Sequence, residues 1–149
     1  MKKTTAIGIN LFIGMLFTLF VSYAQAQETE VKVTAIRSSK GKIVLNVFKD
    51  NDTYDKEQPF KKFVFDKKAL VNGTLTVKCE LAPGIYGITL LDDENDNGKI
   101  DKNLIRIPKE GFGFSNFFME KLKKPTFDDF KVEVKSNAEN KIAIKVKYM

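Results

Sequence analysis

The feature that most constrains the fold is a period-two alternation of apolar and polar side chains along most of the chain after residue 30. In this pattern one face of each β-strand is buried and the other meets water. The segments that predict strands, by alternation or by a continuous apolar run, are 31–35, 43–48, 63–65, 75–81, 85–91, 131–135 and 141–148. With no amphipathic helix pattern beside them, they predict an all-β fold, an antiparallel, immunoglobulin-like β-sandwich of about seven strands.

The N-terminal segment has the pattern of an export signal rather than of a folded element. Two lysines follow Met1, an apolar run covers Ala6–Tyr23, and Ala24-Gln25-Ala26 ends it, which is typical of a secretory signal peptide. The alternative is a membrane anchor, because the run approaches the minimum length for a span. We expect residues 1–26 to be a cleaved signal peptide and 27–149 to form a single domain. That domain would be exported, either periplasmic or secreted to the cell surface or medium, with no membrane span in the mature chain.

The inventory of side chains excludes several kinds of chemistry. The chain has no His and one Cys, Cys79, which rules out Ser-His-Asp and Cys-His catalysis, an intrachain disulfide and a four-Cys zinc site. Cys79 shares a predicted strand face with Leu75, Val77 and Leu81, so we expect a small buried residue. The formal net charge of +6 falls to +4 once Lys2 and Lys3 leave with the signal peptide, because 23 basic residues then face 19 acidic ones. The two arginines, Arg37 and Arg106, are too few for a nucleic-acid surface, and we expect no nucleic-acid partner.

An acidic loop after the predicted strand 85–91 carries the strongest chemical signal. Counted from Asp93, oxygen-bearing side chains fall at positions 1, 3, 5 and 9, a glycine at position 6 and an apolar residue at position 8. This is the spacing of the first nine positions of an EF-hand-type calcium loop, whose alternate residues point oxygen atoms inward. The predicted calcium ligands are the side chains of Asp93, Asn95, Asn97 and Asp101 and the backbone carbonyl of Lys99, with Gly98 at the sharp turn and Ile100 anchoring the loop to the core.

The loop departs from the EF-hand pattern at position 12, where Leu104 stands in place of a bidentate Glu. A further ligand must then come from Asp92, Glu94, Glu110, a loop carbonyl or water. Two carboxylates and two amides predict a weak site, with a Kd of about 10⁻⁴–10⁻³ M, as in extracellular calcium modules. The alternative is a turn rich in Asp and Asn that holds no ion and is stabilised by its own side-chain-to-backbone hydrogen bonds.

Two other features allow different functions. Residues 107–118 include four phenylalanines with glycines between the first of them: Phe112, Phe114, Phe117 and Phe118. These rings would either plug the open end of the sandwich or line a pocket for a small apolar ligand. The adjacent acids Asp128 and Asp129, or Glu110 near the loop, have the chemistry of a carboxylate- or metal-dependent hydrolase.

Three segments stand in a characteristic order: LAPGIY at 81–86, DENDNGKID at 93–101, and IPKEGFGFSN at 107–116 followed by PTFDD at 125–129. Together they resemble the bacterial domain of unknown function family 2141, whose members are small exported proteins. The resemblance extends over most of the chain after the signal peptide. The order of turn, strand and calcium loop is also similar to the B-type repeats of bacterial surface adhesins. The resemblance implies a transthyretin-like or adhesin-B-like β-sandwich with an ion-stabilised loop.

This sequence differs from the family's usual pattern in two places. Leu91-Asp92 stands where a His-Asp pair is frequent, and Phe117-Phe118-Met119 replaces a more polar stretch. From the residues and the resemblance together, we expect an exported, non-enzymatic β-sandwich that binds calcium and acts as an envelope or surface interaction module. The alternatives are a carrier of a small apolar ligand and a hydrolase. Exposed strand edges are compatible with either a monomer or a dimer.

Overall fold

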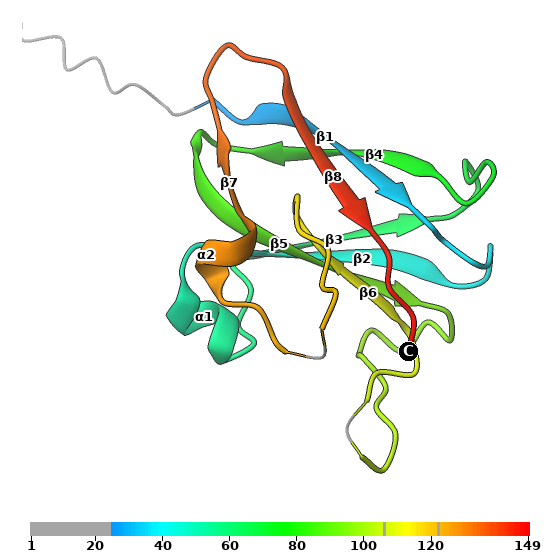
Figure 1. The fold of residues 1–149 in the computed structure, drawn as a ribbon. Coiled ribbons are helices and arrows are strands. Elements are labelled where there is room, and N and C mark those ends of the chain that lie inside the picture. Colours follow the sequence, from blue (N-terminus) through cyan, green and yellow to red (C-terminus); the bar gives the residue numbers. More distant parts are fainter. Residues whose placement is uncertain (1–24, 106, 122) are drawn as a thin grey trace, which may run out of the picture.

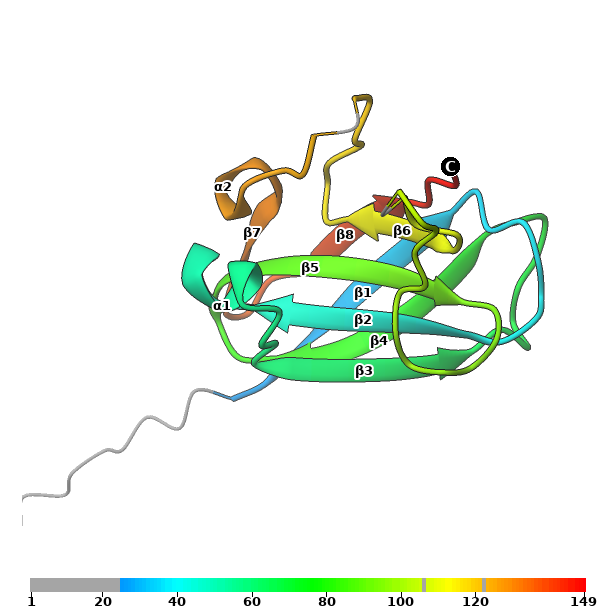
Figure 2. The ribbon, with the colours of Figure 1, turned by 90° about the horizontal axis from the view of Figure 1, so that it is seen from below.

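Two β-sheets stacked face to face form the body of the protein, as Figures 1 and 2 show from two directions. The computed structural model describes residues 25–105, 107–121 and 123–149, so the predicted signal peptide, residues 1–26, lies almost wholly outside the described residues. The elements in chain order are β1 (Gln27–Thr34), β2 (Lys42–Phe48), α1 (Asn51–Asp55), β3 (Lys61–Asp66), β4 (Leu75–Leu81), β5 (Gly84–Asp93), β6 (Gly111–Phe114), α2 (Phe127–Phe130), β7 (Lys131–Val134) and β8 (Asn140–Lys145). The prediction of an all-β sandwich is confirmed.

The two sheets have three and five strands. The smaller has the order β4-β1-β8, and the larger has β3-β2-β5-β6 in a row, with β7 also paired to β5. β5 is long enough for two successive partners, because Gly84–Gly87 pair with β7 and Thr89–Asp92 pair with β6. All these pairs are antiparallel except β1 with β8, which run parallel. The prediction that all strands pair antiparallel was therefore wrong for β1 and β8. Side-chain alternation shows which face of a strand is buried, but it does not show in which direction the strand runs.

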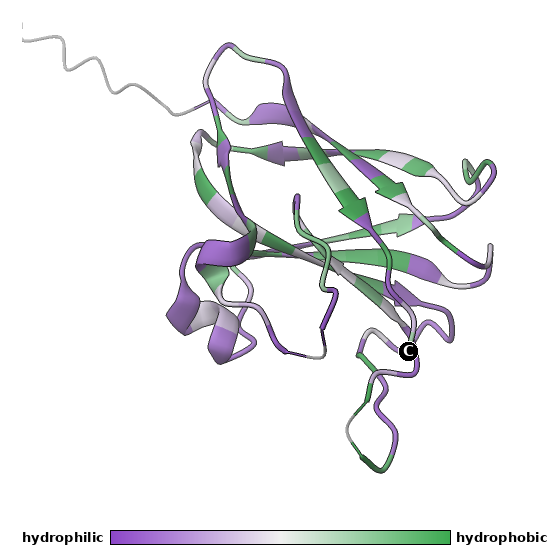
Figure 3. Ribbon diagram, viewed as in Figure 1, coloured by the Kyte–Doolittle hydropathy of each residue, from purple (hydrophilic) through white to green (hydrophobic). Residues whose placement is uncertain are grey.

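Apolar side chains gather in two clusters, and β5 contributes to the burial of both faces of its sheet. The first cluster fills the space between the sheets and includes Val31 and Val33 of β1, Leu45 of β2 and Ile144 of β8. The second lies on the outer face of the larger sheet, under α1 and α2: Phe48, Tyr54, Phe112, Phe114, Met119, Phe127 and Phe130. A strand buried on both faces needs a continuous apolar run rather than an alternation. This explains the run at 85–91, while β1, β4 and β8 alternate in burial, and their alternating hydropathy is visible in Figure 3.

Two short helices cover the second cluster. In α1 the side chain of Asp50 accepts a hydrogen bond from the Thr53 backbone N–H, and α2 begins with a capping box between Thr126 and Asp129. With five and four residues, these helices are too short to produce the periodic pattern by which helices are predicted from sequence. Among the described residues, no helix is long and apolar enough to cross a membrane.

An eighth strand, β6, was not predicted, because two of its four residues are glycines. A Cβ on Gly113 would lie 2.6 Å from the Ile144 side chain, and one on Gly111 would collide with Tyr148 and Val146. The glycines thus allow β6 to pass directly over the last strand and the residues that follow it. The two phenylalanines that alternate with these glycines, Phe112 and Phe114, pack into the second cluster.

The Ser115-Asn116 pair after β6 joins the two sheets. Ser115 is fully buried, and its hydroxyl accepts from the Ile88 N–H (3.0 Å) and donates to the Phe130 carbonyl (2.6 Å). Asn116 exchanges hydrogen bonds with Ala143 of β8 through its backbone N–H (2.8 Å) and its side-chain oxygen (2.9 Å). The segment 111–116 therefore connects the larger sheet to β8 of the smaller one.

Candidate functional site

The predicted calcium loop leaves the end of β5 and returns to β6. Because Asp92 pairs with Gly111, the next residues outward, Asp93 and Glu110, stand opposite each other where the two strands part. Both are buried, with relative exposures of 1% and 5%. The backbone of Gly41, whose φ is +70°, lies directly against the backbone of Asp93. The first residue of the loop is therefore fixed by three segments of the sandwich.

Asp93 organises the turn. Its carboxylate accepts hydrogen bonds from the backbone N–H groups of Asn97 (3.0 Å) and Gly98 (2.7 Å). Asp96 and Gly98 both have positive φ, and Gly98 occupies the position where the spacing places the sharp turn. Ile100 is partly buried against the second cluster, in the anchoring role expected for position 8.

The other predicted side chains converge on Asp101. The side-chain amides of Asn95 and Asn97 both donate to the same Asp101 carboxylate oxygen, at 2.6 and 2.9 Å. Lys99 joins the loop through its backbone N–H, which donates to the Asn97 side-chain oxygen (2.8 Å); no bond of its carbonyl oxygen is found among the hydrogen bonds of the described residues. These hydrogen bonds connect the four predicted side-chain ligands, Asp93, Asn95, Asn97 and Asp101, to one another within the loop.

Glu110 is the buried acid nearest to this group. One of its carboxylate oxygens accepts from the Asp101 backbone N–H (3.2 Å), and the other has no hydrogen-bond partner among the described residues. The Lys109 N–H also donates to the Asp101 carbonyl (2.8 Å), so Glu110 and Asp101 are held side by side. An ionised buried oxygen without a partner is costly. Glu110 therefore has a free ligating position where the loop lacks its position-12 Glu.

The remaining candidates for the missing ligand, Asp92 and Glu94, are engaged elsewhere. Asp92 is completely buried, forms an ion pair with the ammonium of Lys67, and accepts a hydrogen bond from the Tyr148 hydroxyl. Glu94 forms a two-point ion pair with Arg37, at 2.6 and 3.1 Å. The hydrogen bond from Arg37 holds the pKa of Glu94 below its usual value. Neither carboxylate is directed at the loop interior, which leaves Glu110.

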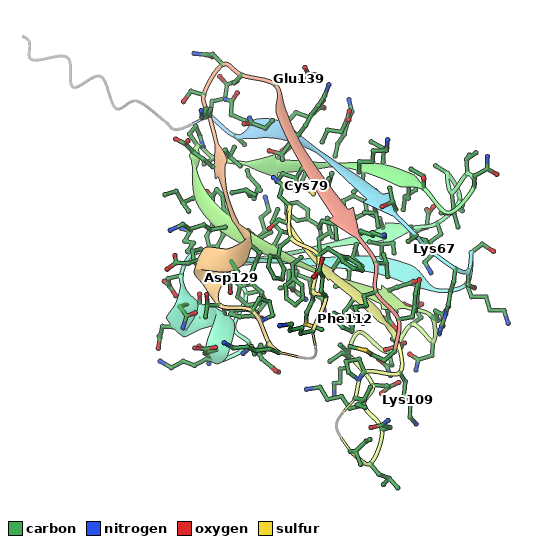
Figure 4. The ribbon with its side chains drawn as sticks, viewed as in Figure 1. Lys67, Cys79, Lys109, Phe112, Asp129 and Glu139 are labelled. Carbon is green, nitrogen blue, oxygen red and sulfur yellow. The ribbon has the colours of Figure 1, made fainter. Side chains whose placement is uncertain are left out.

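Lys67 and Asp92 form the centre of a polar network beside the loop. The Lys67 ammonium also donates to the carbonyls of Ser38 (3.0 Å) and Lys40 (2.6 Å), so all three of its protons have acceptors. Burial and the hydrogen bond to Asp92 raise the pKa of Tyr148. This network links the β1–β2 connection, the residue after β3, the end of β5 and the C-terminus, and Figure 4 shows Lys67 at that end of the sheets.

The loop offers the type of donor atom that calcium prefers, but its side chains are not arranged as a formed metal site. Within residues 25–105, 107–121 and 123–149, no group of three or more His, Cys, Asp or Glu side chains is positioned to hold a metal ion. The two asparagines point amide nitrogens at Asp101, while their side-chain oxygens accept from the backbone N–H groups of Asn97 and Lys99. The available donors are all oxygens on a tight loop, which are the ligands that calcium prefers.

The residues considered for other functions have structural roles. Asp129 caps α2 by accepting from the Thr126 N–H (2.7 Å), which lowers the pKa of Asp129, and Asp128 pairs with Lys131 (2.7 Å). In Figure 4, Asp129 lies on the opposite side of the molecule from Lys109. Cys79 is buried, and burial raises its pKa to about 11, as expected for a packed residue. These positions give no sign of a catalytic cluster in the part of the chain that the structure describes.

The four phenylalanines after the loop divide between core and surface. Phe112 and Phe114 are buried in the second cluster, Phe117 packs against it, and Phe118 is 41% exposed. Phe114 makes ring contacts with Phe130 (5.2 Å between centroids) and Phe117 (6.2 Å). The rings cover the outer face of the larger sheet under α2 rather than the open end of the sandwich.

Comparison with known proteins gave one match. No curated protein and no solved structure matched the chain. A family model described as "Uncharacterized protein conserved in bacteria (DUF2141)" matches residues 31–143, which include all strands except parts of the first and last. The matched span contains the acidic loop, Glu110 and the Ser115-Asn116 connection. The chain therefore belongs to the DUF2141 family of uncharacterised proteins conserved in bacteria.

Proposed function

We propose that this protein is an exported, non-enzymatic β-sandwich that binds calcium at the loop Asp93–Asp101, with Glu110 as the ligand that replaces the position-12 Glu. The ion would hold the loop between β5 and β6 in one shape for an envelope or surface interaction. The donors would be the side chains of Asp93, Asn95, Asn97, Asp101 and Glu110, with the carbonyl of Lys99. The sandwich would be of the transthyretin-like or immunoglobulin-like type.

The observation that carries the proposal is the unpartnered oxygen of the buried Glu110 carboxylate. Asp93 stands across from it, and Asp101 is hydrogen-bonded to it through the backbone. None of the three acids takes part in an ion pair of the described residues. Like charges facing each other across two strands repel. A divalent cation held by oxygen ligands would reverse this repulsion.

Export is supported by the sequence and is compatible with the fold. The segment 1–26 has the three-part pattern of a signal peptide. The eight strands that the structure describes lie within residues 27–149, so cleavage after Ala26 would leave all of them in the mature chain. Outside the cytoplasm calcium is often millimolar, so a site with a Kd of about 10⁻⁴–10⁻³ M would be occupied there.

The test is calcium titration of the 27–149 chain by calorimetry, together with its melting temperature in calcium and in chelator. At a calcium concentration of about ten times Kd, binding should stabilise the fold by about 1.4 kcal/mol. Glu110→Gln should abolish this stabilisation. It should also raise the melting temperature in chelator, because it removes a buried carboxylate that has no cation beside it there.

The matched control is Glu94→Gln, in the same loop but paired with Arg37, which should retain calcium binding. Asp93→Asn with Asp101→Asn should lose it. Absence of any heat or thermal shift in the parent chain would refute the calcium site. Equal destabilisation by Glu110→Gln in calcium and in chelator would show that Glu110 only supports the Asp101 backbone.

A further inference from the structure

The segment between the acidic loop and β6 forms a small hairpin that projects from the sandwich. Lys102 pairs with Pro108 in an isolated bridge, and the Asn103 N–H donates to the Ile107 carbonyl (2.8 Å). The Asn103 side-chain oxygen accepts from the N–H groups of Ile105 (3.1 Å) and Ile107 (2.9 Å). Figure 1 shows this segment extending away from both sheets. The hairpin is therefore a structured projection held by its own hydrogen bonds.

Its tip presents apolar side chains to solvent. Leu104 is fully exposed and Ile105 is 74% exposed, more than any other large apolar residue among those described. The hydrophobic colouring of the outermost part of this segment is visible in Figure 3. Single exposed apolar residues are common on protein surfaces. Two adjacent ones at the end of a projection can both enter an apolar environment at once.

Three lysines lie within a few residues of the tip in the sequence. Lys99, Lys102 and Lys109 are exposed, and none of them forms an ion pair within the described part of the chain. Residues 102–109 contain no acidic side chain. The segment 102–109 thus combines an apolar tip with basic side chains, while Asp101 and Glu110 stand just outside it.

We propose that this hairpin docks the protein on the surface of an anionic lipid bilayer, with Leu104 and Ile105 entering the headgroup–acyl boundary and the three lysines contacting lipid phosphates. Amphipathic projections bind membranes through buried apolar area plus attraction to anionic lipid, and each lysine near such a surface adds to the binding. The apolar area at the tip is too narrow for a stable protein interface, which needs a broad complementary surface. Charge complementarity favours the anionic bilayer as the partner.

The proposal goes beyond calcium binding and does not depend on it. A cation at Asp93, Asp101 and Glu110 would remove negative charge next to the tip, so it would strengthen docking without being required. Vesicle binding in chelator therefore tests the docking surface alone, and an increase of this binding in calcium tests the effect of the ion.

The experiment is flotation of the 27–149 chain, which contains every described strand and helix, with two kinds of vesicle. One contains phosphatidylglycerol and phosphatidylethanolamine in equal parts, and the other contains phosphatidylcholine alone. We expect binding to the anionic vesicles and at least about tenfold weaker binding to the neutral ones, decreasing with added salt. Leu104→Asn with Ile105→Asn should weaken anionic binding at least about tenfold. Lys102→Gln with Lys109→Gln should reduce both the binding and its salt dependence.

The matched control is Val71→Asn with Ile85→Asn, which changes two apolar residues of 65% and 55% exposure far from the hairpin in sequence and should bind like the parent. Failure of the parent chain to float with anionic vesicles, or equal losses in the tip and control variants, would overturn the proposal. Calcium heat without vesicle binding would refute only the docking surface. Vesicle binding in chelator without calcium heat would support docking and refute the calcium site.

Discussion

Replacing Lys67 by Met should destabilise the protein more than any other single lysine change among the described ion pairs. The Lys67 and Asp92 side chains are 1% and 0% exposed, so the variant leaves a carboxylate buried without its cation. Breaking one partner out of a buried pair costs about 3–5 kcal/mol. The free energy of unfolding at pH 7 should therefore fall by about 3–5 kcal/mol.

The assay is urea unfolding followed by far-ultraviolet circular dichroism, because the chain has no Trp to report by fluorescence. Lys67→Met with Asp92→Leu should be more stable than Lys67→Met alone, since the double variant removes both charges. Should Lys67→Met prove too unstable to purify, Tyr148→Phe removes one donor to Asp92 and should cost about 1–3 kcal/mol.

The control is Lys78→Met, which breaks the exposed pair with Glu28 (62% and 64% exposed) and should change stability little. The reasoning would be refuted if Lys67→Met were no more destabilising than this control. It would equally be refuted if the double variant were less stable than Lys67→Met.

Three further changes test other parts of the structure. Ser115→Ala should lower the free energy of unfolding by about 1–3 kcal/mol in urea titration, because a fully buried N–H and a carbonyl each lose a partner. Cys79 should react with a thiol reagent only as fast as the protein unfolds, because it is buried and its pKa is raised to about 11; rapid labelling of native protein would contradict its packing. Arg37→Met should reduce stability slightly at neutral pH, and because the parent holds the pKa of Glu94 down, this difference should vanish as the pH falls through that lowered pKa, as measured by melting temperature against pH.

The strands were predictable because burial of one face requires apolar residues at alternate positions of the sequence. Each of the seven predicted segments corresponds to a strand, from β1 at Gln27–Thr34 to β8 at Asn140–Lys145. β6 has no such pattern, since its glycines are set by the close approach of Ile144 and Tyr148 rather than by burial of their own side chains. Strand direction in the β1–β8 pair is likewise decided by the path of the whole chain.

The loop was predictable in its turn and only partly in its chemistry. The spacing from Asp93 to Asp101 identified the residues that converge, because such turns depend on local side-chain-to-backbone bonds. Glu110 was one of several candidates for the missing ligand, and its position across from Asp93 follows from strand pairing, which local spacing does not contain. The roles of Asp92 with Lys67 and of Ser115 with Phe130 also depend on contacts between distant segments. Nothing in the sequence distinguishes the buried Lys67 from its exposed neighbour Lys68, so the ion pair between Lys67 and Asp92 could not be predicted.

The parallel pairing of β1 with β8 has a consequence for how the chain folds. It places Val31 opposite Ile142, so the sheet that contains the first strand is complete only when the last strand has paired with it. During synthesis β1, the middle strand of the smaller sheet, has one open edge until the C-terminal residues emerge. Contacts between such distant residues also form slowly, because a long loop must close first. The smaller sheet therefore cannot be completed until Asn140–Lys145 have been synthesised.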